Sequence, residues 1–280
     1  MKRLGFVGSR FAAELHMNNL TNVPVEVVGV TSLHKESREA FADKYRIKTY
    51  NDVDSMLPEI DILDICTPPY THEDFTIRAA ENGVHVILEK PFTAYCGPGD
   101  ETFVGNVFPK ELMLKEAIAS AERMCNAVKK HGVKLCYAEN WVYAPPVQKA
   151  VEVIKATKGQ VLWMLGEESH SGSHSSAYGI WRLSGGGSIV GKGCHPLTGA
   201  LYLKREEGIN RSGKPIRPKS VRATTHDITK SPSYIDSGYI RKDYDDVENW
   251  SHMHVIFEDG FVADIYATEI ILGGIRERLE

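Results

Sequence analysis

Long apolar runs, paired cysteines and an excess of basic charge are all missing from this sequence. No segment approaches the roughly 20 apolar residues that a membrane-spanning helix needs. A formal net charge of -4 provides no basic field that would attract nucleic acid or an anionic membrane. The five cysteines are odd in number and lack C-x-x-C spacing, so neither a disulfide framework nor a zinc site is indicated. These absences predict a cytoplasmic protein with reduced thiols, no metal, and no nucleic-acid or membrane partner.

What is present is typical of a folded protein with two domains, because 280 residues exceed what a single core usually serves. Strands and helices alternate through residues 1–138, which predicts an α/β fold with an N-terminal Rossmann domain, a doubly wound parallel sheet. Residues 139–280 contain the longer strand-like runs VRATTHDI, HMHVIFE and FVADIYATEI. They predict a C-terminal α/β domain with a large, mostly antiparallel open sheet. The last residues, GGIRERLE, resemble a strand, so we expect the sequence to be truncated or to lack a disordered tail.

The N-terminal segment GFVGSRFAA resembles a phosphate-binding turn between a strand and a helix. Gly8 fits the first glycine of such a turn, and Ala13 is small enough for the third, but Arg10 stands at the second. A side chain there narrows the approach of a pyrophosphate, although its guanidinium adds positive charge beside the helix N-terminus. The segment alone leaves two readings open, a dinucleotide site and a strand-turn-helix that binds nothing.

Residues 94–109 interrupt the alternation of strands and helices. They contain glycines and prolines and show little periodicity, which predicts a long loop before a helix that reaches His131. Such a loop is either a solvated surface segment or a mobile lid over the cofactor.

Three separated segments together resemble the Gfo/Idh/MocA family of NAD(P)-dependent oxidoreductases: the N-terminal turn, CTPPYTHEDFTIRAAENGVHVILEKPF, and GGGSIVGKGCHPLTGALYL. The hallmarks are a C/S-T-P-x-x-x-H loop, an E-K-P tripeptide and a G-x-H segment in the second domain. The resemblance extends to AENWVYAPPVQKA at the domain junction. It implies a Rossmann domain followed by a domain with an open sheet, which binds substrate and forms a homodimer or homotetramer. It also implies oxidation or reduction of a hydroxyl-bearing carbon in a sugar, inositol or related molecule.

The resemblance also assigns roles to residues of this chain. The cofactor would be bound by Gly8, Ser9, Arg10, Phe11, Ala12, Thr67, Pro68, His72, Glu89 and Lys90, of which Thr67, Pro68 and His72 would line the nicotinamide side. Lys90 would lie next to the reacting carbon, with His195 as its partner. The chain departs from the family pattern at Gly191 and Thr198, where aspartates are frequent. Without an acid at position 191, either Lys90 and His195 form the proton relay alone or the chemistry is altered.

The chemistry of Lys90 and His195 suits acid–base catalysis. A desolvated ammonium group beside a cationic nicotinamide loses its proton more easily, so Lys90 is predicted to act as a base and, in the reverse direction, as an acid. A cis Lys90-Pro91 bond would direct its side chain into the cleft. His195 precedes Pro196 at a predicted helix N-terminus, which favours the neutral imidazole. The alternatives are a solvated lysine at a strand end and a packing histidine.

Other polar residues of the second domain are candidates for substrate contact. We predict that Tyr143, His170, Lys192 and His195 bind the substrate. Trp141 and Tyr143 either stack on a sugar ring or pack in the core. His170 and His174 are four residues apart, but in a segment rich in serine and glycine this spacing does not place both rings on one helical face, so a metal site is disfavoured.

The end of the second predicted strand, VTSLHKESREA, bears on the choice of coenzyme. Ser32 stands where an acid usually binds the adenosine ribose, and Lys35 and Arg38 follow. This charge favours NADP, although NAD remains possible if Glu36 turns inward.

Three functions therefore follow from the sequence. The first is an NAD(P)-dependent dehydrogenase that acts on CH-OH groups of a sugar or cyclitol. The second is a glycosidase that uses bound NAD for transient oxidation. The third is a non-catalytic NAD(P)-binding regulator, which the missing acid at Gly191 favours and the presence of Lys90 and His195 disfavours.

Overall fold

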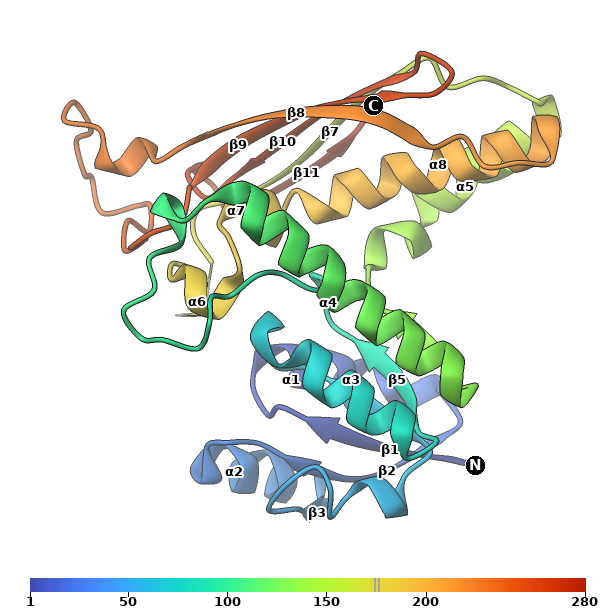
Figure 1. Ribbon diagram of the computed structural model, residues 1–280, viewed down its shortest axis with the longest axis vertical. Helices are drawn as coiled ribbons and strands as arrows, with labels where there is room; N and C mark the ends of the chain where they lie inside the picture. The colour runs from blue at the N-terminus through green and yellow to red at the C-terminus, as the bar shows by residue number, and fades with distance from the viewer. Residues whose placement is uncertain (174, 176) are drawn as a thin grey trace. The chain divides into compact units, whose positions relative to one another are not determined.

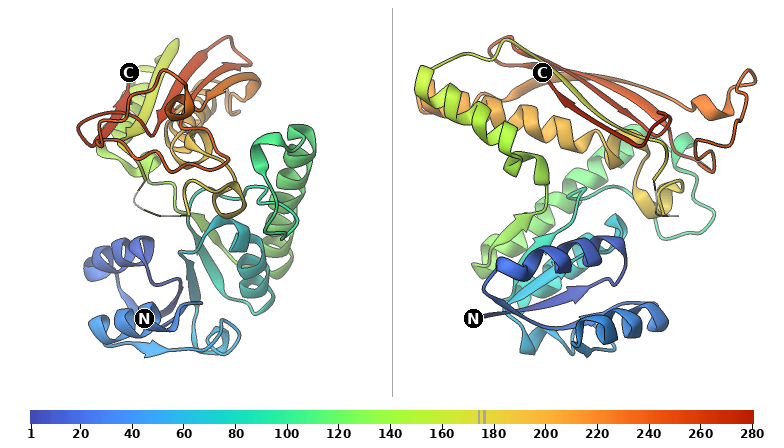
Figure 2. Two further views of the ribbon diagram at one scale, coloured as in Figure 1. Left: turned by 90° about the vertical axis from the view of Figure 1, so that its left-hand side faces the viewer. Right: turned by 180° about the vertical axis from the view of Figure 1, so that it is seen from behind.

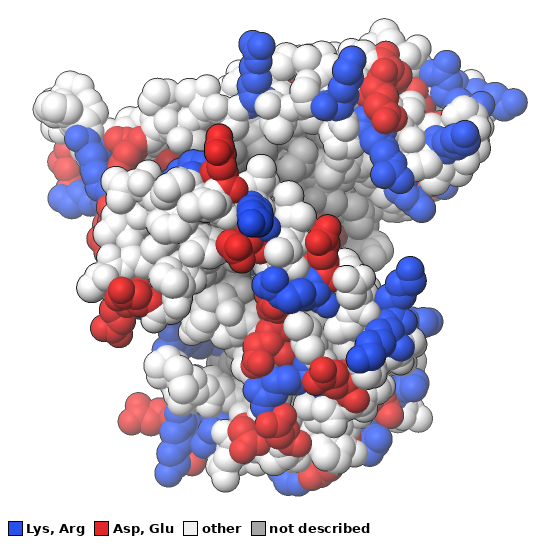
Figure 3. All heavy atoms as spheres, in the orientation of Figure 1, with Lys and Arg blue, Asp and Glu red and all other residues white. Residues whose placement is uncertain are grey.

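A computed structural model describes residues 1–173, 175 and 177–280 (Figure 1). The chain forms two compact units, one made of residues 1–95 and 108–138 and the other of 96–107 and 139–280. His174, part of the disfavoured metal pair, lies outside the described residues. None of the helices within the described residues has the length and apolar character that crossing a membrane requires. On the face drawn in Figure 3, basic and acidic side chains are interspersed.

The first unit is built on a six-stranded sheet in the order β3-β2-β1-β4-β5-β6, in which all paired strands are parallel. This confirms the predicted doubly wound sheet. The order reverses between β1 and β4, and ligands of such sheets bind outside the carboxyl ends of the strands at that point. Its strands and helices are β1 (Lys2–Val7), α1 (Phe11–Asn19), β2 (Val25–Thr31), α2 (Lys35–Tyr45), β3 (Lys48–Thr49), β4 (Ile62–Ile65), α3 (His72–Glu81), β5 (His85–Leu88), α4 (Lys110–His131) and β6 (Leu135–Tyr137), with short 3-10 turns η1 (Leu20–Asn22), η2 (Leu57–Glu59) and η3 (Pro69–Thr71).

Apolar side chains on both faces of this sheet pack against helices. One cluster joins Phe6 of β1 to Ala13 of α1 and Phe41 of α2. The other joins strand residues to Ala79 of α3 and Met124 of α4. Burial of apolar surface on both faces explains why these strands read as continuous apolar runs in the sequence. The two layers of helices leave the strand ends as the place for a ligand.

The second unit contains a five-stranded sheet in the order β11-β7-β10-β9-β8. Only the β7–β10 pair is parallel, so the prediction of a mostly antiparallel sheet is confirmed. Its elements are η4 (Gly105–Val107), η5 (Asn140–Tyr143), α5 (Pro145–Thr157), β7 (Trp163–His170), α6 (Trp181–Ser184), α7 (Ser188–Gly191), α8 (Cys194–Ser212), β8 (Pro218–His226), η6 (Ile228–Lys230), β9 (Trp250–Phe257), β10 (Val262–Thr268) and β11 (Ile275–Leu279).

Helices cover one face of the second sheet. The helix α8 packs on β7 and β10, and α5 packs on α8, as the yellow-green and orange helices in Figure 2 show. Buried and half-buried residues alternate strictly along β9, which is the pattern of a strand with one face in the core. The apolar core of the unit lies between this face and the two helices.

The segment 96–107 belongs to a different unit from the one that the sequence predicts. The sequence placed it in the first domain, whereas the structure packs it into the second unit. The amide of Gly105 donates to the Asp246 carboxylate at 2.6 Å, and a Cβ atom at Gly105 would lie 2.0 Å from the ring of Trp181. A close approach that only glycine permits therefore fixes the segment. Most residues of the segment are exposed, as expected for a surface loop, and Gly105 is buried where the segment is anchored.

Candidate functional site

The first turn of the chain has the geometry of a phosphate-binding turn. Gly8 adopts φ 104°, and a Cβ atom there would lie 2.6 Å from the carbonyl oxygen of Cys66. Both the left-handed conformation and the close approach of β4 require glycine. Gly8 also donates its amide to the Thr31 carbonyl at 2.9 Å. The turn is thus held between the ends of β2 and β4, at the reversal of strand order.

The first turn of α1 is exposed at its start, at Arg10 and Phe11. The Arg10 side chain is exposed, Ala13 is completely buried in the role of a close-packing glycine, and Phe11 is 69% exposed. Among the described residues, no side chain caps the N-terminus of α1. Uncapped helix amides are donors for a pyrophosphate, so this turn fits a dinucleotide. Ser9 is buried and bonds through its Oγ to the Ser37 Oγ at 2.6 Å, whereas Ala12 is half-buried.

The cations at the end of β2 differ in how firmly they are held. Arg38 donates through Nη1 to the Ser32 carbonyl at 3.2 Å, and its buried Nε has no partner among the described residues. Lys35 is exposed and lies 3.8 Å from Glu39. Glu36, the candidate for a ribose-binding acid, is exposed in the first turn of α2. The guanidinium of Arg38 is thus held beside Ser32 at the end of β2, whereas the nearby carboxylate of Glu36 is exposed.

The C-T-P loop after β4 is tied to the segment after β5 by His72. The ring of His72 is fully buried, with Nε2 2.9 Å from the Thr67 carbonyl and Nδ1 3.0 Å from the Pro91 carbonyl. Burial lowers the pKa of His72, and its bonds to backbone carbonyls oppose that shift. His72 therefore joins two loops from inside. Thr67 and the half-buried Pro68 form the loop surface, and the Thr67 hydroxyl bonds to that of Thr71 at 2.6 Å.

Lys90 follows β5 at the same edge of the sheet as Gly8 and Thr67. The Lys90-Pro91 bond is cis. The Lys90 amide donates to Oε2 of Glu89 at 3.0 Å, and the Lys90 side chain is half-buried. The carboxylate of Glu89 thus braces the backbone that carries the predicted base.

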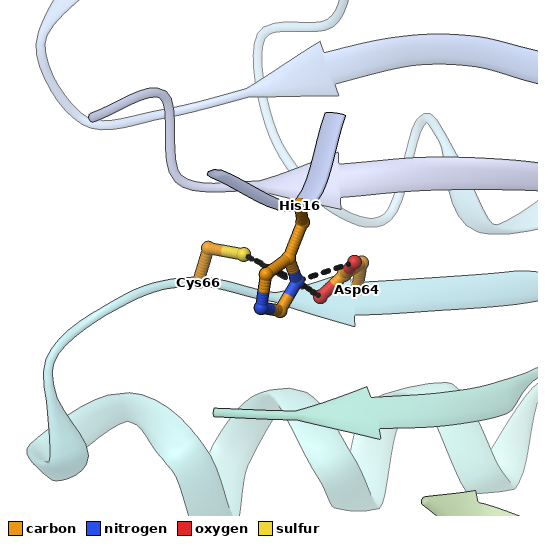
Figure 4. A group of neighbouring side chains, drawn as sticks. All are labelled: His16, Asp64 and Cys66. Carbon is orange, nitrogen blue, oxygen red and sulfur yellow. Dashed lines mark hydrogen bonds and ion pairs between the residues drawn. The ribbon is translucent and has the colours of Figure 1, made fainter. Parts of the chain in front are cut away.

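A buried polar cluster next to this backbone escaped the sequence analysis. His16 of α1 places Nδ1 2.9 Å from Oδ2 of Asp64 and Nε2 3.0 Å from Oε1 of Glu89. Figure 4 shows the ring directed at the strand that carries Asp64 and Cys66. Burial disfavours the charged ring, but its hydrogen bonds to the two carboxylates prevail and raise the pKa of His16 to about 10. The ring is an imidazolium at neutral pH.

This cluster also has donor atoms close enough for a metal ion. His16, Asp64 and Cys66 each contribute one within 4.8 Å of the others. However, burial and then the charges of Asp64 and Glu89 raise the pKa of the Cys66 thiol well above its usual value, and a metal ligand must be a thiolate. Protons on the two nitrogens of His16 already account for the short contacts, so the donor geometry is explained without an ion.

His195 lies in the first turn of α8 in the second unit, where its ring contacts two carboxylates. Its Nδ1 is 2.7 Å from Oε1 of Glu139, and its Nε2 is 3.7 Å from Oε1 of Glu168. The indole of Trp141 stacks on the ring with centroids 6.4 Å apart and planes 22° apart. Trp141 is 8% exposed, so of the two readings for this residue the structure shows packing against the histidine. Both carboxylates are almost fully buried.

The other predicted substrate residues fall into different surroundings. His170 ends β7 with Nε2 3.4 Å from Oε1 of Glu168, so it joins the same cluster as His195. Lys192 is 4% exposed and pairs with Glu269 at 3.0 Å, and it donates to the Ser173 hydroxyl at 2.9 Å. Tyr143 of η5 is 73% exposed.

Three acids of the second unit were missed by the sequence analysis: Glu139, Glu168 and Glu269. Each is at most 5% exposed, and each has one buried oxygen, Oε2, with no hydrogen-bond partner among the described residues. Buried carboxylate oxygens usually have partners, so these mark a place for a donor. One signal was readable: Glu139 lies in the AEN segment at the domain junction and Glu168 ends an alternating run, where an inward acid breaks the apolar pattern.

The chain is similar to known proteins in both sequence and fold. Residues 2–102 match the Gfo/Idh/MocA family, described as an oxidoreductase family with an NAD-binding Rossmann fold. The chain is 25% identical over 210 residues to D-glucoside 3-dehydrogenase of Escherichia coli (strain K12), covering 72% of this chain and 53% of the relative. It is 29% identical over 126 residues to UDP-N-acetylglucosamine 3-dehydrogenase of Acidithiobacillus ferrooxidans, covering 45% of this chain and 39% of the relative.

Among solved structures, the fold is similar to that of GenD2 from gentamicin A biosynthesis in complex with NAD. The TM-score is 0.76 with 21% sequence identity, and the match covers 99% of this chain and 68% of that chain. This likeness shows a shared fold for both units. The chain spans about half of the length, or less, of the two curated relatives that it matches.

Proposed function

We propose that this chain is an NAD(P)-dependent dehydrogenase of a sugar, inositol or related polyol, because residues 2–102 match the Gfo/Idh/MocA family of oxidoreductases. The observation that carries the proposal is the glycine turn of Gly8, which lies at the reversal of strand order and beside an uncapped helix N-terminus. The two curated relatives are named as dehydrogenases of a glucoside and of a sugar nucleotide, which supports a carbohydrate hydroxyl as the reacting group.

The coenzyme would supply hydride chemistry, and the chain's own residues would manage the proton. Lys90, on a backbone braced by Glu89, would take the hydroxyl proton in oxidation and return it in reduction. His195, with its Nδ1 engaged by Glu139, would use Nε2 as the second acid–base atom. The amides of the α1 N-terminus would bind the pyrophosphate.

A screen of sugars, inositols and sugar acids, followed at the absorbance of reduced nicotinamide, tests this function. With the substrate it identifies, Lys90→Ala should lower kcat by roughly 10²–10⁴-fold, because the acid–base group is removed. Binding of the coenzyme, measured by calorimetry, should be retained. Lys115→Ala on the exposed face of α4 is the matched control. Absence of binding of either coenzyme to the native protein would overturn the proposal, as would full turnover by Lys90→Ala.

For the coenzyme, the arrangement around Arg38 favours NADP over NAD. Its guanidinium is held at Ser32, and the exposed Glu36 does not oppose a 2′-phosphate there. Arg38→Gln should weaken binding of NADP by roughly 10- to 100-fold and leave binding of NAD nearly unchanged, since one charge-assisted contact is worth about 1.5–3 kcal/mol. Calorimetry with each coenzyme checks this. A native preference for NAD would contradict the assignment.

The same screen separates the other two functions. A glycosidase would release an aglycone with no net change in nicotinamide absorbance. A regulator would bind coenzyme and turn over nothing. The geometry at His195 favours the enzyme, because a pure binding module has no need for a histidine between two buried carboxylates.

We also propose that the protein forms a homodimer or homotetramer through the face of the second sheet that no helix within the described residues covers. That face carries the aromatic rings of Trp250 and Tyr266, which contact each other at a centroid distance of 6.4 Å. Light scattering after gel filtration measures the mass, and a monomer at micromolar concentration would contradict this proposal.

A further inference from the structure

His195 is held between carboxylates that come from two distant parts of the second unit. Glu139 precedes η5 and accepts from the Trp141 amide as well as approaching Nδ1 of His195. Glu168 lies on β7 and faces Nε2. Each ring nitrogen therefore has a carboxylate on its own side, at 2.7 Å and 3.7 Å respectively. The first distance is a hydrogen bond, and the second is too long for one.

Position 191, where the sequence lacks an acid, is crowded. A Cβ atom at Gly191 would lie 3.0 Å and 3.3 Å from two ring atoms of Tyr178, so a side chain there would require this ring to shift by a few tenths of an ångström. Among the described residues, Glu139 and Glu168 are the acids whose side-chain oxygens approach the ring of His195.

The two carboxylates are not saturated by the protein. Oε2 of Glu139 and Oε2 of Glu168 are both buried and have no hydrogen-bond partner among the described residues. Leaving such atoms unpartnered costs free energy, so a fold retains them where they serve a reaction or a ligand. Glu168 also contacts Nε2 of His170 through Oε1 at 3.4 Å, which holds the carboxylate in place beside His195.

We propose that Glu139 and Glu168 act with His195 as a proton relay that replaces the acid absent at position 191. Glu139 is the positioning residue: it keeps a proton on Nδ1, so that Nε2 carries the lone pair. Glu168 accepts the proton that Nε2 receives. The relay rests on the proposed dehydrogenase function.

In the oxidation direction, a bound oxidised nicotinamide would accept the hydride that leaves the substrate carbon with its electron pair. Nε2 of His195 takes up the proton that leaves the hydroxyl as the carbonyl forms. The resulting imidazolium lies between two carboxylates, which compensate its charge. Glu168 then takes the Nε2 proton, which restores the neutral ring, and releases it to solvent water before the next turnover.

The tautomer of His195 can be measured without any turnover. In the full chain labelled with ¹⁵N-histidine, NMR should show a protonated Nδ1 and an unprotonated Nε2 for His195, with the signal assigned by its loss in His195→Gln. Glu139→Gln should shift the Nδ1 proton upfield and mix the tautomers, because the amide accepts less strongly. Glu167→Gln, on the opposite face of the same strand, should leave the spectrum unchanged. A native ring protonated on Nε2 alone, or an Nδ1 signal indifferent to Glu139→Gln, would overturn the positioning role.

Kinetics with the substrate found by the screen test Glu168. Glu168→Gln should lower kcat by roughly a hundredfold or more and change KM less than threefold, because the group acts on a proton and not on binding. Glu167→Gln should retain native kcat. If Glu168→Gln keeps native kcat, the relay is wrong while the dehydrogenase function stands. If no coenzyme-dependent turnover is found for the native protein, the dehydrogenase function fails, and the relay as a catalytic device fails with it, whatever the tautomer.

Discussion

Two largely buried histidines of this protein each lie between two carboxylates, one histidine in each unit. At His16 both contacts are short, 2.9 Å to Asp64 and 3.0 Å to Glu89. At His195 one contact is short, 2.7 Å to Glu139, and the other measures 3.7 Å. Both ring nitrogens of His16 therefore form hydrogen bonds to carboxylates, whereas only one ring nitrogen of His195 does so.

The carboxylates differ in the same way as the rings. The second oxygen of Glu89 accepts the Lys90 amide at 3.0 Å, so this acid is fully engaged. Glu139 and Glu168 each keep a buried oxygen without a partner among the described residues. A saturated network holds its charge permanently and rigidifies the fold, whereas an unsaturated one has capacity left for a ligand or a proton. We infer that His16 supports the backbone of Lys90 and that His195 takes part in the chemistry.

The largest expected effect separates stability from turnover. Asp64→Asn removes one of two charges around the His16 imidazolium and should lower the free energy of unfolding by about 3–5 kcal/mol, the usual cost of breaking a buried pair. Glu168→Gln should lower the free energy of unfolding by less than about 1 kcal/mol. It removes a buried charge with an unpartnered oxygen, and this gain offsets the contacts that are lost. Urea unfolding followed by circular dichroism measures both. If Glu168→Gln destabilises the chain as much as Asp64→Asn does, the inferred difference between the His16 and His195 clusters is wrong. Asp54→Asn, an exposed partner of Arg78, is the control.

An intermediate effect concerns pH. The folded-state pKa of His16 is raised from 6.5 to about 10, so its stabilising contribution is fully present below about pH 6.5 and is lost as pH rises through 10. Burial opposes ionisation of Glu89, but the bond to His16 prevails and lowers its pKa below 4.5, so the carboxylate side of the pair weakens only in acid. The difference in unfolding free energy between the native chain and His16→Gln should be flat near pH 6 and shrink toward pH 10. If this difference in unfolding free energy instead grows with pH, the pKa of His16 is not raised in the folded state.

The smallest expected change in unfolding free energy concerns a third cluster of histidine and carboxylate side chains. It lies on the half-exposed face of the second sheet. Asp264 lies 2.7 Å from Nδ1 of His254, whose side chain is 39% exposed. Solvent screens such a pair, so Asp264→Asn should change the free energy of unfolding by less than about 1 kcal/mol. Thermal unfolding of the two proteins at low and high salt checks it. A decrease in unfolding free energy as large as that of Asp64→Asn would mean that solvent exposure does not determine how much these histidine–carboxylate clusters stabilise the fold.

Much of the first unit could be predicted from the sequence. The strand of residues 62–65, the strand of 85–88 and the helix that ends at His131 lie where apolar periodicity and Gly132 indicate, because each depends on neighbours along the chain. Gly8 was recognisable because a left-handed turn between strand and helix needs glycine. The helix start at Cys194 was similarly readable from Pro196.

Sequence alone determined the alternation of strands and helices, the glycine turn at Gly8 and the position of Lys90 at a strand end, since local backbone preferences and burial patterns carry these features. Only the tertiary structure decided that residues 96–107 join the second unit and that His195 meets Glu139 and Glu168. Acids far apart in the sequence resemble ordinary surface acids until folding brings them together. Their chemistry depends on burial and on distances of a few ångströms, which no local pattern encodes.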